Sequence, residues 1–93
     1  MSTFTIIVPV FNEKDNLSRL ESELVKFINS TVFETKVLLI NDGSTDGSED
    51  IINKICKKND FFESVSFIKN SGLSSALKAG FDLCNSEYIG YID

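Results

Sequence analysis

The sequence contains no histidine and no tryptophan, and its 93 residues include one proline and two cysteines. Without histidine, these residues cannot form a histidine-based catalytic triad, an imidazole-ligated zinc site or a histidine pH switch. Cys56 and Cys84 lie far apart among apolar residues, which predicts core packing and not a redox CxxC pair or a zinc knuckle. Any chemistry carried by these residues therefore depends on carboxylates.

Basic residues and long apolar runs are also scarce. Nine Lys and Arg residues against fourteen Asp and Glu residues give a net charge of −5. A surface of that sign repels phosphate backbones, so no nucleic-acid partner is expected. No apolar run approaches the roughly 18 to 20 residues that cross a bilayer, and the N-terminus does not resemble a signal peptide. With 42% hydrophobic residues, we expect one compact domain, or part of one, in the cytoplasm.

Strand-like and helix-like patterns alternate along the chain. Apolar runs rich in β-branched residues predict buried strands at residues 5–10, 36–40, 65–68 and 87–93. Between them, apolar residues at three- and four-residue steps predict helices over residues 17–28, 51–56 and 73–84. Pro9, near the end of the first strand, should stop the ladder of hydrogen bonds. Asn12 can cap the first helix, and Asp46 with Glu49 resembles a capping box for the second.

The predicted fold class is α/β, in the order β-α-β-α-β-α-β. Crossovers of this length impose a mainly parallel sheet with helices on both faces, as in half of an open Rossmann-like fold. Gly80 on the apolar face of the third helix would let that helix lie close to the sheet. Ligands in such folds bind beyond the carboxyl ends of the strands. Those ends carry residues 11–13, 41–43, 70–72 and Asp93, so carboxylates and amides should gather along one edge.

Such an edge favours a nucleotide bound together with a metal ion. Glu13, Asp42 and Asp93 can hold an anionic phosphate only if a divalent cation, Mg²⁺ or Mn²⁺, supplies positive charge. Carboxylates also accept hydrogen bonds from ribose hydroxyls and nucleobase N–H groups. Asp46 is better explained as the cap of the second helix. Asp42 is the stronger candidate for ligand binding, because a turn that already has this cap needs no further acidic residue before Gly43. Asn12 fits either role.

The glycines exclude two common nucleotide-binding classes. The five glycines fit neither GxGxxG nor GxxxxGK, so the chain is not expected to be a dinucleotide oxidoreductase or a P-loop NTPase. The first strand is also not followed by the glycine-rich, arginine-bearing loop of a sugar nucleotidyltransferase.

Four ordered segments resemble the motifs of family 2 glycosyltransferases of the GT-A fold. Residues 7–13 read IVPVFNE, like the family's PxYNE segment, and residues 39–48 read LINDGSTDGS, like its DDGSxDG loop. Residues 70–80 are similar to the third block, and residues 88–93 resemble the strand that leads into a DxD motif. The resemblance spans essentially the whole chain.

The resemblance implies a donor-binding role for residues at the expected edge. Pro9, Val10 and Phe11 would lie against the nucleobase, and Glu13 would stand near the nucleotide. Asp42, followed by Gly43, would hydrogen-bond the base. Asp93 matches the first aspartate of DxD, which approaches the ribose and the metal ion. The second aspartate and the general base would lie beyond residue 93, so the catalytic residue is not among those given.

The resemblance also implies a reaction and its partners. The full-length protein would transfer a sugar from a nucleotide-diphosphate sugar to a polyprenyl phosphate or a saccharide, by metal-assisted inverting displacement. The chain looks closest to the dolichyl- or undecaprenyl-phosphate sugar transferases, which would place the full-length protein at the cytoplasmic face of a membrane. Residues 1–93 would be the N-terminal nucleotide-sugar-binding part of the domain, truncated at the first aspartate of DxD and inactive alone.

Two departures and two alternatives accompany the resemblance. Asn41 stands where many members have aspartate, and Leu73 where several polyprenyl-phosphate sugar transferases have a basic residue, so neither is expected to contribute charge.

A receiver-like signalling domain would need an acidic pair after the first strand, which this chain lacks. The other alternative is a non-catalytic fragment that binds a nucleotide or a partner. If residues 88–92 form a central strand of the full domain, the isolated chain exposes a sheet edge and should self-associate.

Overall fold

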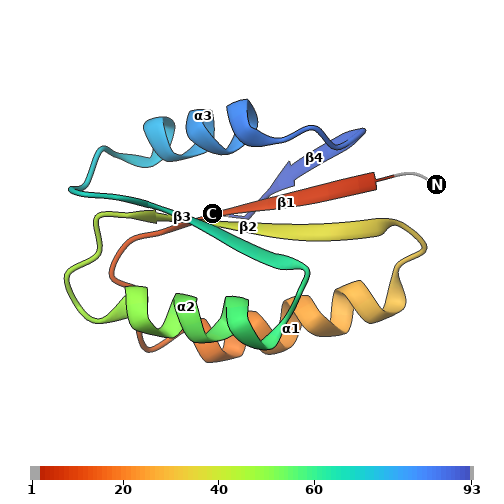
Figure 1. Cartoon of the computed structure of the whole chain (residues 1–93), viewed down its shortest axis with the longest axis horizontal. Coiled ribbons are helices and arrows are strands. Elements are labelled where there is room, and N and C mark those ends of the chain that lie inside the picture. Colours follow the sequence, from red (N-terminus) through yellow and green to blue (C-terminus); the bar gives the residue numbers. More distant parts are fainter. Residues whose placement is uncertain (1–2, 93) are drawn as a thin grey trace.

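The computed structural model describes residues 3–92 as one sheet with helices on both faces (Figure 1). In chain order, the elements are β1 (Thr3–Val10), α1 (Leu17–Ser30), β2 (Glu34–Asp42), α2 (Ser48–Lys58), β3 (Phe62–Phe67), α3 (Leu73–Leu83) and β4 (Tyr88–Tyr91). The strand order is β3-β2-β1-β4, and every pairing in it is parallel. The predicted α/β fold and its element order are therefore confirmed.

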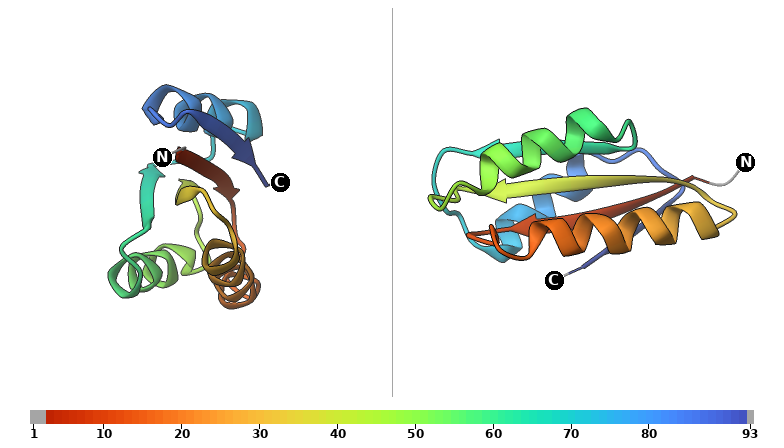
Figure 2. Two further views of the ribbon diagram at one scale, coloured as in Figure 1. Left: turned by 90° about the vertical axis from the view of Figure 1, so that its right-hand side faces the viewer. Right: turned by 90° about the horizontal axis from the view of Figure 1, so that it is seen from below.

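The helices divide between the two faces of the sheet. Helices α1 and α2 cover one face, and α3 covers the other (Figures 1 and 2). Successive residues of a strand point to opposite faces. In β1, Ile6 and Val8 therefore pack with Leu24 of α1 and Ile52 of α2, while Ile7 belongs to the core cluster on the α3 face. This alternation explains why β1 reads as a continuous apolar run.

A glycine brings α3 close to β1. A Cβ atom at residue 80 would lie 2.6 Å from Cγ2 of Ile7, closer than two carbon atoms approach without a shift. The prediction that Gly80 permits close packing of this helix is thus confirmed. The packing holds α3 against the sheet, and with it the loop that joins α3 to β3.

Pro9 does not stop the ladder between β1 and β2, so this expectation was wrong for that pairing, although β1 ends at Val10 as predicted. Pro9 pairs in register with Ile40, and β1 continues to Val10. On the other side, the pairing with β4 reaches Ile7 within the described residues, and the carbonyl oxygen of Ile7 accepts a hydrogen bond from the Ile92 N–H at 3.0 Å. The backbone nitrogen of Pro9 points toward the same neighbouring strand as the carbonyl group of Ile7, beyond the described pairs of β1 with β4. The missing N–H of Pro9 is tolerated because no ladder bond among the described residues needs it.

The residues that cap the first two helices also differ from the expectation. The N-caps are Asn16 for α1 and Gly47 for α2, not Asn12 and Asp46. Asn12 instead has a left-handed backbone with φ 52°. Asp46 accepts a hydrogen bond from the Ser48 N–H at 3.0 Å, so it still satisfies an N–H at the start of α2. Both side chains are used mainly to join loops, as described below.

The two cysteines are free and partly buried, as predicted. Cys56 packs against the core on the α1 and α2 face, and Cys84 against the core on the α3 face. Burial raises the pKa of the Cys56 thiol, and the nearby charge of Glu63 adds to this, while a hydrogen bond with Ser64 opposes it. These thiols fill space in the core.

Strand β4 lies at one edge of the sheet in the described chain. It is shorter than predicted, and its side chains remain open to solvent, with Tyr88 52% and Tyr91 55% exposed. Strand β3 at the other edge starts three residues earlier than the predicted position 65 and leaves Ile68 outside the sheet. Self-association of the isolated chain stays a prediction, and a monodisperse monomer in light scattering would contradict it.

Candidate functional site

A cavity of about 380 Å³ lies at the carboxyl edge of the sheet. Its wall comes from the end of β1 and the following loop, the last residue of β2, and the loop that leads into α3. The lining residues are Pro9, Val10, Phe11, Glu13, Asp42, Asn70, Gly72 and Leu73. The structure therefore brings together Pro9, Val10, Phe11, Glu13 and Asp42, all of which the sequence predicted for one site. Gly43 does not line the cavity, and Asp93 lies outside the described residues.

Asp42 is buried at the end of β2, with 3% of its surface exposed. Its Oδ1 accepts a hydrogen bond from the Ser71 N–H at 2.7 Å. Its Oδ2 accepts from the Gly72 N–H at 2.9 Å and from Asn70 Nδ2 at 3.0 Å. Asn70 Nδ2 also donates to the Asp42 carbonyl oxygen at 3.2 Å. The carboxylate thus ties the end of β2 to the loop before α3, a contact that the sequence analysis missed.

Gly43 allows this loop to rest directly on the end of β2. Its φ is +73°, and a Cβ atom there would lie 2.3 Å from both Asn70 N and the carbonyl carbon of Lys69. Any side chain at position 43 would push the loop away from the strand. Gly43 therefore shapes the cavity by permitting close contact between two backbone segments, although it does not line the cavity itself.

Asn12 joins the loop after β1 to the loop after β2. The Asn12 N–H donates to Ser44 Oγ at 3.0 Å, and Asn12 Oδ1 accepts from the Thr45 N–H at 2.8 Å. Between the two proposals for Asn12, a helix cap or a site residue, the structure shows a third role. Asn12 holds two loops together beside the cavity.

Asp46 and Ser48 form the second part of this loop junction. The Ser48 hydroxyl is buried, accepts from the Glu13 N–H at 3.2 Å and donates to Asp46 Oδ1 at 2.5 Å. Asp46 Oδ2 accepts from the Lys14 N–H at 3.1 Å. The hydrogen bond from the Ser48 hydroxyl lowers the pKa of Asp46, more than partial burial raises it, and backbone N–H groups lower it further. Asp46 is therefore a charged acceptor at neutral pH that anchors the Glu13 segment.

The described residues do not form a metal site by themselves. Among residues 3–92, no three side chains of the His, Cys, Asp and Glu types lie close enough together to hold an ion. Glu13 is exposed at the cavity, and its Oε2 accepts a hydrogen bond from Asn16 Nδ2 at 2.8 Å. The predicted metal ligand, Asp93, lies outside the described part of the chain. The metal prediction therefore depends on Asp93 and on residues that would follow it.

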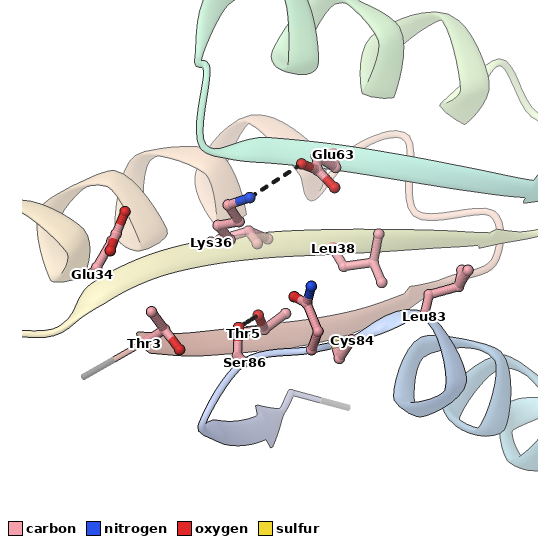
Figure 3. Close-up of a pocket in the computed structure, with 11 residues that line it drawn as sticks. Thr3, Thr5, Glu34, Lys36, Leu38, Glu63, Leu83, Cys84 and Ser86 are labelled. Atoms are coloured by element: carbon pink, nitrogen blue, oxygen red, sulfur yellow. Dashed lines mark hydrogen bonds and ion pairs between the residues drawn. The ribbon is translucent and has the colours of Figure 1, made fainter. Parts of the chain in front are cut away.

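A second cavity, of about 250 Å³, lies at the opposite end of the sheet (Figure 3). Its wall comes from the first residues of the strands and from the segment after α3. Here polar side chains pair with each other. The hydroxyls of Thr5 and Ser86 share a hydrogen bond, and Lys36 Nζ lies 3.7 Å from Glu63 Oε1 (Figure 3). No sequence motif pointed to this cavity.

The model of glycosyl transferase family 2 matches residues 5–93, which include every segment that lines the first cavity. The chain belongs to this family. The resemblance noted in the sequence is therefore confirmed. In the part of the chain described by the structure, no helix combines the length and hydropathy needed to span a membrane.

Curated relatives of the chain include enzymes named for polyprenyl-linked sugar transfer. A prophage bactoprenol glucosyl transferase homolog of Escherichia coli strain K12 is 34% identical over 89 residues, which cover 96% of this chain and 29% of the relative. An undecaprenyl-phosphate 4-deoxy-4-formamido-L-arabinose transferase of Pseudomonas syringae pv. syringae is 29% identical over 90 residues, covering 96% of this chain and 27% of the relative. The chain spans less than a third of the length of these relatives.

Two solved structures share the fold. Mannosyltransferase PcManGT from Pyrobaculum calidifontis, in complex with GDP-Man and Mn²⁺, superposes with a TM-score of 0.72 at 21% identity, covering 92% of this chain and 25% of that one. Staphylococcus aureus TarS gives a TM-score of 0.74 at 22% identity, covering 98% of this chain and 27% of that one. These similarities support the predicted GT-A-type, Rossmann-like fold.

Proposed function

We propose that this chain is the donor-binding part of a glycosyltransferase. The full-length protein would transfer a sugar from a nucleotide-diphosphate sugar to a polyprenyl phosphate or a saccharide by inverting displacement. One observation carries this proposal. In a chain of family 2, five of the residues predicted to bind the donor line one cavity at the carboxyl edge of a parallel sheet, namely Pro9, Val10, Phe11, Glu13 and Asp42.

The chemistry of the cavity suits a nucleoside. Pro9, Val10 and Phe11 form an apolar wall against which a nucleobase can pack. Glu13 offers a carboxylate that can accept hydrogen bonds from ribose hydroxyls. The volume of about 380 Å³ falls within the usual range of roughly 300 to 1,000 Å³ for small-molecule sites. The chain's own residues would thus bind and orient the donor.

The diphosphate of the donor would need a cation. None of the described residues that line the cavity is basic, and Glu13 and Asp42 are acidic. We propose Mg²⁺ or Mn²⁺ as this cation, with Asp93 as the first aspartate of a DxD motif. When bound, the ion would offset the charge that develops on the departing diphosphate. The Mn²⁺ bound with GDP-Man in the mannosyltransferase of the same fold supports this choice.

The acceptor proposal rests on the relatives. Both the bactoprenol glucosyl transferase homolog and the undecaprenyl-phosphate sugar transferase are named for lipid-linked sugar transfer. We therefore favour a polyprenyl phosphate over a saccharide as the acceptor, with the full-length protein acting at the cytoplasmic face of a membrane. Residues 1–93 would then be the N-terminal donor-binding part of a longer domain, truncated before the general base. The receiver-like alternative has no support in a chain of family 2.

Calorimetric titration of the full-length protein tests the proposal. UDP, GDP and their sugars would be added with and without Mn²⁺, and sugar transfer to polyprenyl phosphate would be assayed in parallel. We expect binding of one nucleotide class that depends on Mn²⁺, with transfer by the full-length protein and none by the 93-residue chain. Failure to bind any nucleotide would refute the donor-site assignment. Binding without transfer by the full-length protein would favour the non-catalytic alternative, and transfer by the isolated chain would refute the truncation proposal.

A further inference from the structure

Three consecutive backbone N–H groups in the loop after β1 are bound by side chains of the loop after β2. The N–H groups of residues 12–14 donate, in chain order, to Ser44 Oγ at 3.0 Å, Ser48 Oγ at 3.2 Å and Asp46 Oδ2 at 3.1 Å. Each backbone N–H is an obligatory hydrogen-bond donor, so these side chains satisfy the segment at three adjacent points. Residues 44–48 therefore determine the path of the segment that carries Glu13 to the donor cavity.

Glu13 is held at both ends of its backbone unit. Its N–H is bound by Ser48, and its carbonyl oxygen accepts hydrogen bonds from the N–H groups of Asn16 at 2.9 Å and Leu17 at 3.1 Å, at the start of α1. A residue that is fixed in this way before a ligand arrives loses less conformational freedom on binding. The carboxylate of Glu13 therefore reaches the cavity from a backbone position that the fold has already set.

Ser48 connects Glu13 to Asp46 through a single hydroxyl group. A hydroxyl has one donor and two acceptor positions. The Ser48 hydroxyl donates to Asp46 Oδ1 at 2.5 Å, which leaves its lone pairs to accept from the Glu13 N–H. Ser48 has none of its surface exposed, and residues 44–48, which the structure describes in full, do not line the donor cavity. Any effect of Ser48 on a ligand in that cavity must therefore pass through the residues that it holds.

We propose that Ser48 is a positioning residue for recognition of the donor ribose, with Asp46 orienting its hydroxyl. Ser48 fixes the backbone of Glu13, and the Glu13 carboxylate then accepts hydrogen bonds from the ribose hydroxyls. The inference rests on the proposed function, because it presumes that the cavity takes a nucleotide. A Ser48 that merely begins α2 would affect stability, whereas a positioning Ser48 also affects how strongly the ribose hydroxyls contribute to binding.

Nucleotide titration of the full-length protein tests this role. In the presence of Mn²⁺, UDP and GDP would each be compared with the 2′,3′-dideoxy form, which lacks the ribose hydroxyls. For the nucleotide that the wild type binds, we expect the hydroxyls to strengthen binding about tenfold or more. Ser48→Ala removes the hydroxyl that holds Glu13, so the ratio of the two affinities should fall below about threefold.

A double-mutant cycle tests whether Ser48 acts through Glu13. In Glu13→Ala the preference for the ribose hydroxyls should already be lost, so adding Ser48→Ala should lower the ratio no further. A further drop would mean that Ser48 acts by another route and would overturn the proposal. Asp46→Asn should lower the ratio in the same direction as Ser48→Ala, and it provides a readout if Ser48→Ala does not fold. Asp50→Asn removes the same charge from the exposed first turn of α2 and should leave the ratio at the wild-type value.

Hydrogen exchange in the 93-residue chain tests the loop contact without any ligand. In Ser48→Ala, the Glu13 amide loses its acceptor and should exchange about tenfold faster or more. The amide of Leu39, which is buried in the middle of β2, should change less. Equal acceleration of both amides would indicate a general loss of stability and would overturn the positioning role, and so would unchanged exchange at Glu13.

The two measurements separate failure of this inference from failure of the proposed function. An unchanged ratio in Ser48→Ala, with nucleotide bound by the wild type, would overturn the positioning role and leave the donor site standing. A wild type that binds a nucleotide without any preference for the ribose hydroxyls would overturn the part assigned to Glu13, and the inference with it. If the wild type binds neither UDP nor GDP, the proposed donor site falls, and the role of Ser48 in ribose recognition falls too, even where exchange at Glu13 is faster.

Discussion

The two ends of the sheet carry cavities that are built in different ways. At the carboxyl end, loops complete the wall beside the ends of β1 and β2. Hydrogen bonds to these loops determine where each one lies, as between Asp42 and Ser71 or between Asn12 and Thr45. At the amino end, the wall consists largely of strand residues whose positions follow from the ladder, and exposed pairs such as Lys36 with Glu63 lie on top of it. The shape of the first cavity therefore depends on a few side chains. The shape of the second depends on the sheet as a whole.

The largest loss of stability from a change at the carboxyl end of the sheet is expected at Gly43. In Gly43→Ala, the new Cβ meets the backbone of Lys69 and Asn70 at a positive φ, so we expect a loss of about 2 to 4 kcal/mol in the free energy of unfolding. Gly47→Ala is the matched control, because φ is also positive there but the nearest atom to a Cβ is 3.9 Å away. It should lose only about 1 to 2 kcal/mol. Equal losses in denaturant unfolding would show that the contact between the loop and β2 contributes nothing.

The next effect concerns donor affinity. We expect Asp42→Ala in the full-length protein to weaken donor binding by about 1.5 to 3 kcal/mol, the usual cost of losing a hydrogen bond to a charged group. The dissociation constant of the donor, measured by calorimetry, checks this. Donor affinity that stays at the wild-type value would remove Asp42 from the site and would erase the functional difference between the two ends of the sheet.

The sequence predicted the carboxyl edge better than it predicted the contacts within it. Strand and helix positions follow from local periodicity, which is why the alternation of Ile6 and Ile7 between two cores could be anticipated. Asp42 and Glu13 could be assigned to one edge because parallel strands bring their carboxyl ends together. Which loop each polar side chain meets depends instead on the packed fold. No local pattern shows that Asn12 reaches Thr45.

The same reasoning explains the error at Pro9. Whether a proline interrupts a ladder depends on which neighbouring strand its nitrogen faces and how far that strand extends. That information lies in β4, at the other end of the chain. The errors at the helix caps have a related origin, since Asp46 accepts two hydrogen bonds from Ser48 at the start of α2 and one from Lys14 in the loop after β1.

A third prediction concerns acid unfolding. Because its folded-state pKa is lowered, charged Asp46 contributes stability above the ordinary carboxyl pKa of 3.8, and this stability is lost as the pH falls through the lower folded value. We therefore expect the stability difference between the wild type and Asp46→Asn to be constant at neutral pH and to shrink below about pH 4. Unfolding measured by circular dichroism at several pH values would show this. A difference that persists unchanged in strong acid would mean that the charge of Asp46 does not hold the loop junction.

The smallest effect is expected at the amino end. The side chains of Lys36 and Glu63 are 60% and 62% exposed, so solvent screens their attraction. We expect Lys36→Met to change the free energy of unfolding by less than about 1 kcal/mol and to leave donor affinity as it is. A loss of donor affinity in this variant would show that the second cavity takes part in donor binding, and it would contradict the functional difference between the two ends of the sheet.

Chemical-shift mapping of the 93-residue chain tests the donor-site assignment most directly, because it detects weak binding and locates it. We would titrate isotope-labelled chain with UDP and with GDP in the presence of Mg²⁺. The account predicts that the amides of Phe11, Glu13, Ser71 and Gly72 shift together, while those of Thr5, Glu63 and Ser86 at the opposite end stay in place. Shifts confined to the amino end, or no shifts at nucleotide concentrations that saturate the full-length protein, would contradict it.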